Sequence, residues 1–447
     1  MNRIALALML ALAPGCAAID QLFVPPTDQV VVTVRPDPIY EELVDTYVEM
    51  CAVSQYRPVT GVLGGTPGHA VMYLKGACFD EDAGYPRLRR CKGNTADRGS
   101  PEHGAGVSVN KWFKNVNWVA TPGKKLFFDG DLGPYDMLDQ AHYDRTVQKA
   151  VDLGMYKGVE IHPIPGKEDI STAEFVAYDS IGTDFALRFG RSAFCTRMPL
   201  WPEQLAQVMD YLNSLNDEYH SGKQEYNWSG YADNCVHTLH NAVAAAGIWK
   251  PKSVRAVKLR QLFNIAVPAN TFIDLAYLAN RYPIENLNKI RRDELQWHNL
   301  TERDWLPSGP GGLVKSLAVH QENELYDTKF RMLVQEGWFT AGNVKKARKL
   351  LVDGRYAQLD ANLHYFRQRY DRILEKRKPN NWVDQLRGED YRNDKAAYYA
   401  YIERRRKRLD ELFDELAELD KKRARLLERA RADWEKEMGR PPAPVSP

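Results

Sequence analysis

The sequence has no apolar run of about 20 residues, the length that a helix needs to cross a bilayer. It also has no excess of either charge, since 61 Lys and Arg residues stand against 59 Asp and Glu residues. A dedicated nucleic-acid binder is expected to carry a strongly basic face, so we expect no nucleic-acid partner. With 44% hydrophobic and 27% charged residues, the 447-residue chain has the composition of a globular protein.

Several motifs of nucleotide, serine-hydrolase and metal sites are missing as well. No Gly-Lys-Ser/Thr follows the glycine-rich stretch 61–68, so this stretch is not a phosphate-binding loop. No Gly-x-Ser-x-Gly sequence supports a serine hydrolase. His237 and His240 have helical spacing, but no second cysteine pair and no His-Glu-x-x-His motif completes a zinc site. We therefore predict no metal and no cofactor.

The N-terminal residues have the pattern of a targeting signal. A short charged segment, 1–3, precedes the apolar stretch 4–13, which is too short to span a membrane. A small residue then precedes Cys16, and this resembles a bacterial lipoprotein signal. The resemblance implies a signal peptide over 1–16, lipidation of Cys16, and an outer-membrane protein that faces the periplasm. The alternative is an ordinary cleaved signal and a free periplasmic or secreted protein.

The sequence contains six cysteines, Cys16, Cys51, Cys78, Cys91, Cys195 and Cys235. Export would place them in an oxidising compartment, where disulfides persist. If the first is lipidated and the last stays a thiol, four remain, and three pairings are open. Cys78 and Cys91 flank a polar, glycine-containing stretch, so a local bridge is our first choice, and Cys51 with Cys195 follows by elimination. The alternative is that some of them are buried free thiols.

Hydrophobic spacing predicts several helices and strands. Ile39, Leu43, Tyr47 and Cys51 recur every four residues, which predicts a helix over 38–55. Strand composition marks seven segments, 69–74, 106–113, 116–120, 125–128, 158–164, 174–180 and 185–189. Further helices are predicted over 202–215 and 235–247. Because Gly, Pro and Asp separate the strands, we expect an antiparallel sheet.

The last quarter of the chain is helical and charged. A coiled-coil pattern at three- and four-residue spacing comprises Leu409, Leu412, Leu416, Leu419, Arg423, Leu426 and Ala430. We expect one helix over 398–438, about 60 Å long, within an antiparallel hairpin over 341–440. This hairpin is a candidate surface for a helical partner. The basic run 404–408 is followed directly by acidic residues, so we read it as a solvated helix surface.

Two segments, 166 residues apart, carry the residue types of thiol chemistry. His69 begins a predicted strand after a glycine-rich loop, and Cys235 begins a predicted helix after Asp233 and Asn234, which are good N-cap residues. A helix N-terminus and a neighbouring imidazolium both lower a thiol pKa. The backbone N–H of Cys235 is a candidate donor to an oxyanion, and His69 is a candidate base.

These residues resemble the NlpC-type papain-like cysteine hydrolases. The matching segments are Gly68-His69-x-x-x-Tyr73 and Asn234-Cys235 followed by an Ala-rich helix. The likeness is greatest to the circularly permuted branch in which His precedes Cys, as in the lecithin retinol acyltransferase-like group and some bacterial envelope proteins. It covers roughly residues 40–250 and implies a helix packed on an antiparallel sheet, with Cys235 as nucleophile and His69 as base.

The resemblance also implies a third polar residue that orients the histidine from the next strand. Our first choice is Asn117, with Asn110 and His103 behind it. The candidate substrate-binding residues are Asn234, Tyr231 and Tyr73. The alternative to a catalytic site is a buried cysteine on a packed helix and a histidine satisfied at a strand end.

The predicted fold is α+β, a papain-like antiparallel sheet with packed helices followed by an all-α C-terminal region with a long antiparallel hairpin. The predicted parts are a signal peptide (1–16), a tether (17–38), a cysteine hydrolase domain (39–250), a helical connector (251–340), the hairpin (341–440) and a disordered tail (441–447). The expected activity is that of an envelope thiol hydrolase that cleaves an amide in a cell-wall peptide or an envelope protein. The alternatives are a lipid acyl hydrolase or transferase and a non-enzymatic lipoprotein that binds a partner.

Overall fold

The computed structural model describes residues 21–22, 38–54, 57–58, 68–92, 103–133, 135–230, 232–254, 267–321, 323–327, 332–334 and 342–437. The predicted signal peptide, the predicted tail and all of the predicted tether except residues 21, 22 and 38 lie outside these ranges. Among the helices that fall within them, none is both long and apolar enough to cross a membrane.

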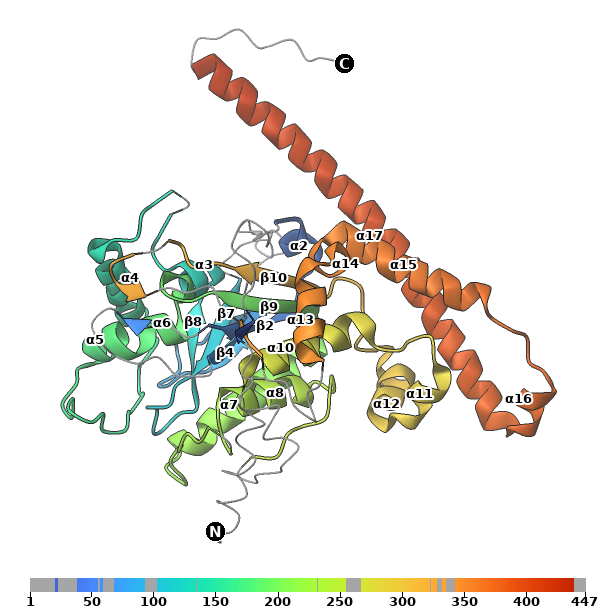
Figure 1. Ribbon diagram of the computed structural model, residues 1–447, viewed down its shortest axis with the longest axis horizontal. Helices are drawn as coiled ribbons and strands as arrows, with labels where there is room; N and C mark the ends of the chain where they lie inside the picture. The colour runs from blue at the N-terminus through green and yellow to red at the C-terminus, as the bar shows by residue number, and fades with distance from the viewer. Residues whose placement is uncertain are drawn as a thin grey trace. The chain divides into compact units, whose positions relative to one another are not determined.

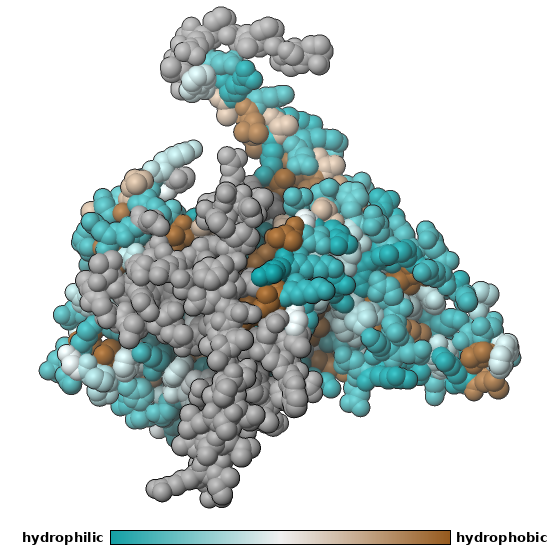
Figure 2. Space-filling view, viewed as in Figure 1, coloured by the Kyte–Doolittle hydropathy of each residue, from teal (hydrophilic) through white to brown (hydrophobic). Residues whose placement is uncertain are grey.

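The chain divides into two compact units. The first comprises Met1–Pro36 and Asp45–Tyr365, and the second comprises Asp37–Val44 and Phe366–Pro447. All residues of the candidate site belong to the first unit. On the face seen in Figure 2, the described surface is mainly hydrophilic, and apolar residues are scattered over it.

A six-stranded antiparallel sheet is the centre of the first unit, so the fold is α+β as predicted (Figure 1). Its strands in spatial order are β10 (Leu313–Leu317), β9 (Ala193–Pro199), β2 (Tyr47–Val53), β4 (His69–Lys75), β7 (Gly104–Val109) and β8 (Trp118–Pro122). Three small two-stranded pairs accompany it: β1 (Gln21–Leu22) with β12 (Met332–Leu333), β3 (Arg57–Pro58) with β11 (Tyr326–Asp327), and β5 (Ala77–Phe79) with β6 (Leu88–Arg90).

The first unit also contains helices. They are α3 (Lys124–Asp129), α4 (Gln140–Asp152), α5 (Thr172–Phe175), the π-helical turn η3 (Val176–Ser180), α6 (Ile181–Asp184), the 3₁₀ turn η4 (Leu187–Phe189), α7 (Pro202–His220), α8 (Cys235–Ala245), α10 (Pro268–Arg281), α11 (Leu287–Arg292), α12 (Glu294–Arg303), α13 (Asn343–Val352) and α14 (Gly354–Ala357). Helix α8 packs on β4, and α10 packs on β2 and β9. Phe272 and Ile273 of α10 share one buried apolar cluster with Ala52 and Phe194 of the sheet.

Strands β2, β4 and β7 are buried at every position, and this explains why the first of them was predicted as a helix. The predicted helix over 38–55 is wrong, because only α2 (Pro38–Leu43) is helical and Tyr47–Val53 forms β2. A strand that is buried on both faces shows no alternation of polar and apolar residues. The predicted strands over 125–128 and 174–180 are helical instead, and 185–189 holds a short 3₁₀ turn. The predicted strands at 69–74, 106–113 and 116–120 are confirmed within a few residues.

The second unit contains a helical hairpin. Helix α15 (Leu359–Glu375) begins in the first unit and ends in the second, where it is followed by α16 (Trp382–Leu386) and the 50-residue α17 (Gly388–Glu437). Three ion pairs join the first arm to α17, Arg367–Asp410, Asp371–Arg406 and Arg377–Glu403. Because the numbers rise on one helix as they fall on the other, the two arms run antiparallel. An antiparallel hairpin with one long helix is thus present as predicted, but α17 begins at Gly388 instead of 398, and α13 and α14, which fall within the predicted 341–440, belong to the first unit.

Both predicted disulfides are present. Cys78 bonds to Cys91 across the small β5–β6 pair, and Cys51 bonds to Cys195 between the neighbouring strands β2 and β9. Cys235 is a free thiol.

Candidate active site

Cys235 is the first residue of α8, as predicted, and its position is fixed by a helix cap. The side chain of Asn234 accepts hydrogen bonds from the backbone N–H groups of Val236 and His237, at 2.9 and 3.2 Å. Its amide also donates to the carbonyl of Gly230, at 2.7 Å. The side chain of Asn234, which we expected to bind substrate, thus holds the preceding loop against the start of the helix.

The sulfur of Cys235 lies beside the first residues of β4. The backbone N–H of Ala70, the residue after His69, donates a hydrogen bond to this sulfur. Burial raises the pKa of the Cys235 thiol to about 11, although the hydrogen bonds from Ala70 and Val236 act in the opposite direction. The expected lowering of the thiol pKa by the helix N-terminus is therefore outweighed by desolvation.

His69 is the first residue of β4, and one ring nitrogen is held by a neighbouring strand. Its Nε2 lies 2.9 Å from the Oγ of Ser108 on β7. Burial, together with the positive charge of Arg191, lowers the pKa of the His69 ring to about 3. Both His69 and Cys235 are 7% exposed. At neutral pH the site thus holds a neutral imidazole and a neutral thiol.

A buried carboxylate stands behind Ser108. The Ser108 hydroxyl donates to Oδ1 of Asp184 at 2.7 Å, and the amide of Asn110 donates to Oδ2 at 3.0 Å. Ser180 donates to the same Oδ2, and Ser180 in turn pairs with the Tyr156 hydroxyl. Burial raises the pKa of Asp184 to about 6, against the lowering effect of these hydrogen bonds.

The sequence did not identify this chain of hydrogen bonds from His69 to Asp184. Ser108 and Asp184 lie 39 and 115 positions beyond His69, and a serine and an aspartate on packed elements leave no local pattern. The first choice for the polar residue that orients the histidine was Asn117, and the group that contacts the His69 ring is the hydroxyl of Ser108.

Of the three candidates for the third polar residue, one belongs to this network. Asn110 reaches it by binding Asp184. Asn117 lies elsewhere, since its Oδ1 accepts from Thr238 on α8 at 2.8 Å. His103 precedes β7, and its backbone carbonyl accepts from the N–H of Gly76.

The two halves of the site are joined by the packing of α8 on β4 and by one shared charge. The positive charge of Arg191 acts on the ionisation of both Cys235 and His69. No hydrogen bond joins these two side chains, both of which lie in described segments. Because Ser108 contacts Nε2, the other ring nitrogen of His69 is Nδ1.

A buried tyrosine, Tyr226, interacts electrostatically with Cys235. The side chain is fully buried, and its OH has no hydrogen-bond partner within the described ranges. Burial raises the pKa of Tyr226 well above its usual value, and the charges of Asp233 and Cys235 raise it further. A buried hydroxyl without a partner lacks its hydrogen bond, so a ligand oxygen that accepts from it would be favoured.

The remaining predicted substrate-binding residues are Tyr231 and Tyr73. Tyr231 lies outside the described residues. Tyr73 is buried in the sheet among aromatic rings, 6.1 Å from Tyr47 and 6.3 Å from Phe127 between ring centroids.

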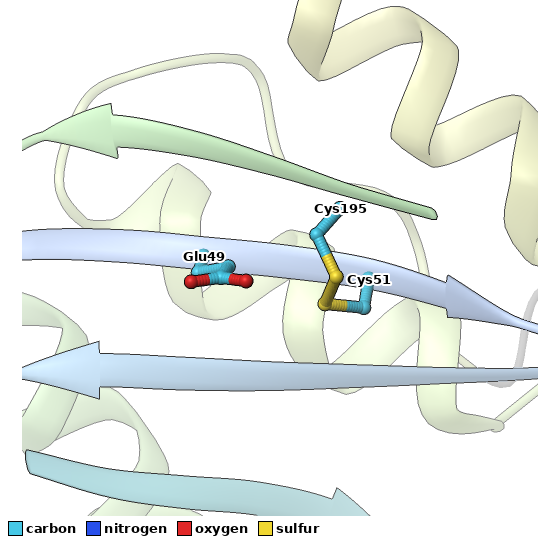
Figure 3. A group of neighbouring side chains, drawn as sticks. All are labelled: Glu49, Cys51 and Cys195. Carbon is cyan, nitrogen blue, oxygen red and sulfur yellow. A yellow bond between two sulfur atoms is a disulfide. The ribbon is translucent and has the colours of Figure 1, made fainter. Parts of the chain in front are cut away.

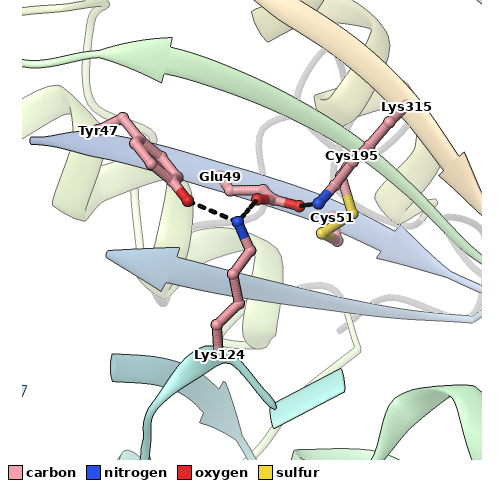
Figure 4. Close-up of a disulfide and its surroundings, with 6 residues drawn as sticks. All are labelled: Tyr47, Glu49, Cys51, Lys124, Cys195 and Lys315. Carbon is pink, nitrogen blue, oxygen red and sulfur yellow. Dashed lines mark hydrogen bonds and ion pairs between the residues drawn. A yellow bond between two sulfur atoms is a disulfide. The ribbon is translucent and has the colours of Figure 1, made fainter. Parts of the chain in front are cut away.

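A second polar cluster lies on the sheet, around Glu49 of β2. Glu49 lies close to the sulfur atoms of Cys51 and Cys195 (Figure 3), but these sulfurs are bonded to each other and offer no thiolate to a metal. Glu49 instead pairs with two lysines, Lys315 at 2.5 Å and Lys124 at 3.3 Å (Figure 4).

The histidine pair on α8 is also engaged within the protein. His237 Nδ1 lies 3.1 Å from the side-chain oxygen of Asn234. His240 stacks on Trp249, and its Nε2 lies 2.9 Å from the carbonyl of Lys250. These contacts give both rings a structural role.

The fold and the site together define an α+β protein with a cysteine at a helix N-terminus beside a histidine-bearing strand. No protein-family model, no curated protein and no solved structure matches this chain. The functional argument therefore proceeds from the geometry of the site.

Proposed function

We propose that this protein is a thiol hydrolase of the cell envelope, with Cys235 as nucleophile and His69 as base, and that it cleaves an amide in a cell-wall peptide or envelope protein. The observation that carries the proposal is the position of the Cys235 sulfur. It lies at a helix N-terminus, within hydrogen-bond range of the backbone next to His69. The resemblance to papain-like hydrolases of the permuted type supports the same roles.

The proposed reaction begins from the neutral pair. As the sulfur attacks the amide carbonyl carbon, its proton passes to Nδ1 of His69, and the carbonyl oxygen becomes an oxyanion. The imidazolium then gives this proton to the leaving nitrogen, the C–N bond breaks, and a thioester remains on Cys235. Water attacks the thioester and gives a proton to His69, the C–S bond breaks, and the proton returns to the sulfur.

Two donors are proposed to stabilise the oxyanion. The backbone N–H of Cys235 is one of the groups that a helix leaves without an intrahelical partner at its first turn. The Tyr226 hydroxyl is the second, because it is buried, it interacts electrostatically with Cys235, and no described group accepts from it. Donors that are already in place in a buried site stabilise developing charge without reorganisation.

Envelope location is part of the proposal. It is supported by the lipoprotein-like residues that end at Cys16. Two disulfides in the first unit also favour an oxidising compartment. Lipidation of Cys16 would attach the protein to a membrane, and without it the protein would be periplasmic or secreted.

The decisive experiment assays the purified protein on cell-wall peptide fragments by amine release. Cys235→Ala and His69→Gln are expected to abolish hydrolysis while the melting temperature stays close to that of the wild type. His364→Gln, which removes an exposed histidine on α15, is the matched control and is expected to retain full activity. Full hydrolysis by Cys235→Ala would overturn the proposal.

A second candidate function is binding of a partner by α17. Leu426 and Leu427 near the end of this helix are 52% and 71% exposed, on the predicted coiled-coil stretch. A partner-binding lipoprotein would lose function on replacement of both leucines by glutamine and keep it in Cys235→Ala. A hydrolase would show the reverse, so one pair of variants separates the two classes. A lipid ester in place of the amide is tested by the same assay with an acylated lipid as substrate.

A further inference from the structure

In the chain of hydrogen bonds from His69 through Ser108 to Asp184, the chemistry of the groups decides which atom donates and which accepts. An ionised carboxylate only accepts hydrogen bonds, so the single hydrogen of the Ser108 hydroxyl is directed to Asp184. The contact between Ser108 and His69 Nε2 must then use a lone pair of the serine oxygen. Nε2 therefore carries the proton, and a neutral imidazole with a proton on Nε2 has a free lone pair on Nδ1.

Protonation of Asp184 reverses the direction of the hydrogen bonds between Asp184, Ser108 and His69. Oδ2 already accepts from Asn110 and Ser180, and the amide nitrogen of Asn110 cannot accept. The added proton is therefore best placed on Oδ1, which has Ser108 as its partner. Oδ1 then donates to Ser108, the serine hydrogen turns to Nε2 of His69, and the ring proton has to lie on Nδ1.

We infer that Asp184, acting through the Ser108 hydroxyl, sets which ring nitrogen of His69 carries the proton, so that protonation of Asp184 switches the base off. The consequence for catalysis rests on the proposed thiol hydrolysis, because only a free Nδ1 accepts the proton of Cys235. Ser108 and Asp184 are positioning residues, since both act through His69.

The surroundings of Asp184 place this switch within the physiological range. The charged and titratable groups that face it are Arg191, Tyr156 and, through Ser108, His69. Burial raises the pKa of Asp184 to about 6, whereas burial and Arg191 lower the pKa of His69 to about 3. Between pH 8 and pH 5, Asp184 therefore takes up a proton and the His69 ring does not.

One substitution reproduces the protonated state at every pH. In Asp184→Asn, the new amide nitrogen cannot face Asn110, because two donors would meet. The new amide oxygen then replaces Oδ2, and the amide nitrogen donates to Ser108, as the protonated acid does. This variant is expected to hold His69 in the tautomer with the proton on Nδ1 and to lower kcat/KM by about a thousandfold or more.

The test reads the tautomer directly by NMR of the ¹⁵N-histidine-labelled full chain, with His69→Gln used to assign the His69 signals. In the wild type, the proton is expected on Nε2 at pH 8 and on Nδ1 at pH 5, with a midpoint near pH 6. Ser108→Thr keeps the hydroxyl and is expected to keep the transition, whereas Ser108→Ala is expected to lose it. Asp179→Asn removes a carboxylate from the same helical region and is expected to leave the transition in place.

A second arm measures kcat/KM against pH on the substrate of the proposed reaction. The acid limb is expected near pH 6 in the wild type and in Ser108→Thr, and it is expected to disappear in Ser108→Ala. A single His69 tautomer from pH 8 to pH 5, or a doubly protonated ring at pH 5, would overturn the inference even if Cys235-dependent hydrolysis is found. A tautomer change with midpoint near pH 6 supports it even if hydrolysis is absent and the proposed function fails.

Discussion

Burial shifts the ionisation of Cys235 and His69 in opposite directions, and both shifts favour the neutral form. The pKa of the thiol rises to about 11 and the pKa of the ring falls to about 3, so the neutral thiol and the neutral ring are favoured at rest. In the proposed reaction, the sulfur is then activated only as its proton moves to His69 during attack. This differs from a cysteine whose thiolate is already formed before substrate binds.

The first prediction follows from the raised thiol pKa. We expect alkylation of Cys235 by iodoacetamide to be slow at neutral pH and to rise about tenfold per pH unit between pH 7 and pH 10, because only the thiolate fraction reacts rapidly. Mass spectrometry of the labelled peptide measures the rate. The disulfide-bonded cysteines, which do not label without reductant, serve as internal controls. A plateau already reached near pH 7 would mean that a stable thiolate is present.

The second prediction concerns the Tyr226 hydroxyl. If it donates to the oxyanion, Tyr226→Phe lowers kcat by about 10²–10³ and leaves KM nearly unchanged, because the bond forms only in the transition state. Tyr219→Phe is the matched control, since its ring packs against Tyr226 with a centroid separation of 5.4 Å and its hydroxyl contacts Asp233. Steady-state kinetics on cell-wall peptide fragments distinguish them, and equal losses in both variants would contradict a specific role for Tyr226.

At the scale of helices and strands, local sequence patterns identified the start of helix α8 and the strand that begins at His69. They missed several strands inside the sheet. The start of α8 was predictable, because Asn234 is a strong N-cap residue before an Ala-rich segment. The strand of His69 was predictable from its composition. Strands β9 and β10 were missed, and β2 was taken for a helix, since buried central strands lack an alternating pattern and depend on distant partners.

The cap of α8 carries the third prediction. Asn234→Ala removes two bonds to helix N–H groups and one to Gly230, so we expect a loss of about 1 kcal/mol in the free energy of unfolding. Asn234→Asp keeps the acceptor and loses only the donor to Gly230, so a smaller loss is expected. Urea denaturation with the disulfides intact measures both, and equal stability of Asn234→Ala and wild type would show that the cap contributes nothing.

For the whole molecule, the candidate nucleophile and base could be predicted from the sequence, and the groups that support them could not. Cys235 and His69 were identified because each lies beside a recognisable helix or strand start. Ser108 contacts His69, and Asp184 contacts Ser108, only when β7 pairs with β4 and α6 packs on β7. Such a contact depends on the register of the sheet, which a single sequence does not encode locally.

The last prediction concerns the stability of the whole protein in acid. Glu49 is fully buried, and although burial opposes its ionisation, Lys124, Lys315 and Arg197 lower the pKa of Glu49 to about 2, well below its ordinary value of 4.5. The unfolded chain binds this proton first, so the stabilisation is complete above about pH 4.5 and is lost as the pH falls toward about 2. The size of this stabilisation is roughly 3 kcal/mol, because the pKa of Glu49 falls by about 2.5.

Glu49→Gln is therefore expected to lower the free energy of unfolding by about that amount at pH 7 and by much less at pH 3, as measured by urea denaturation. Glu294→Gln, an exposed control on α12, should change neither value, and an equal deficit of Glu49→Gln at both pH values would show that its carboxylate charge does not stabilise the fold.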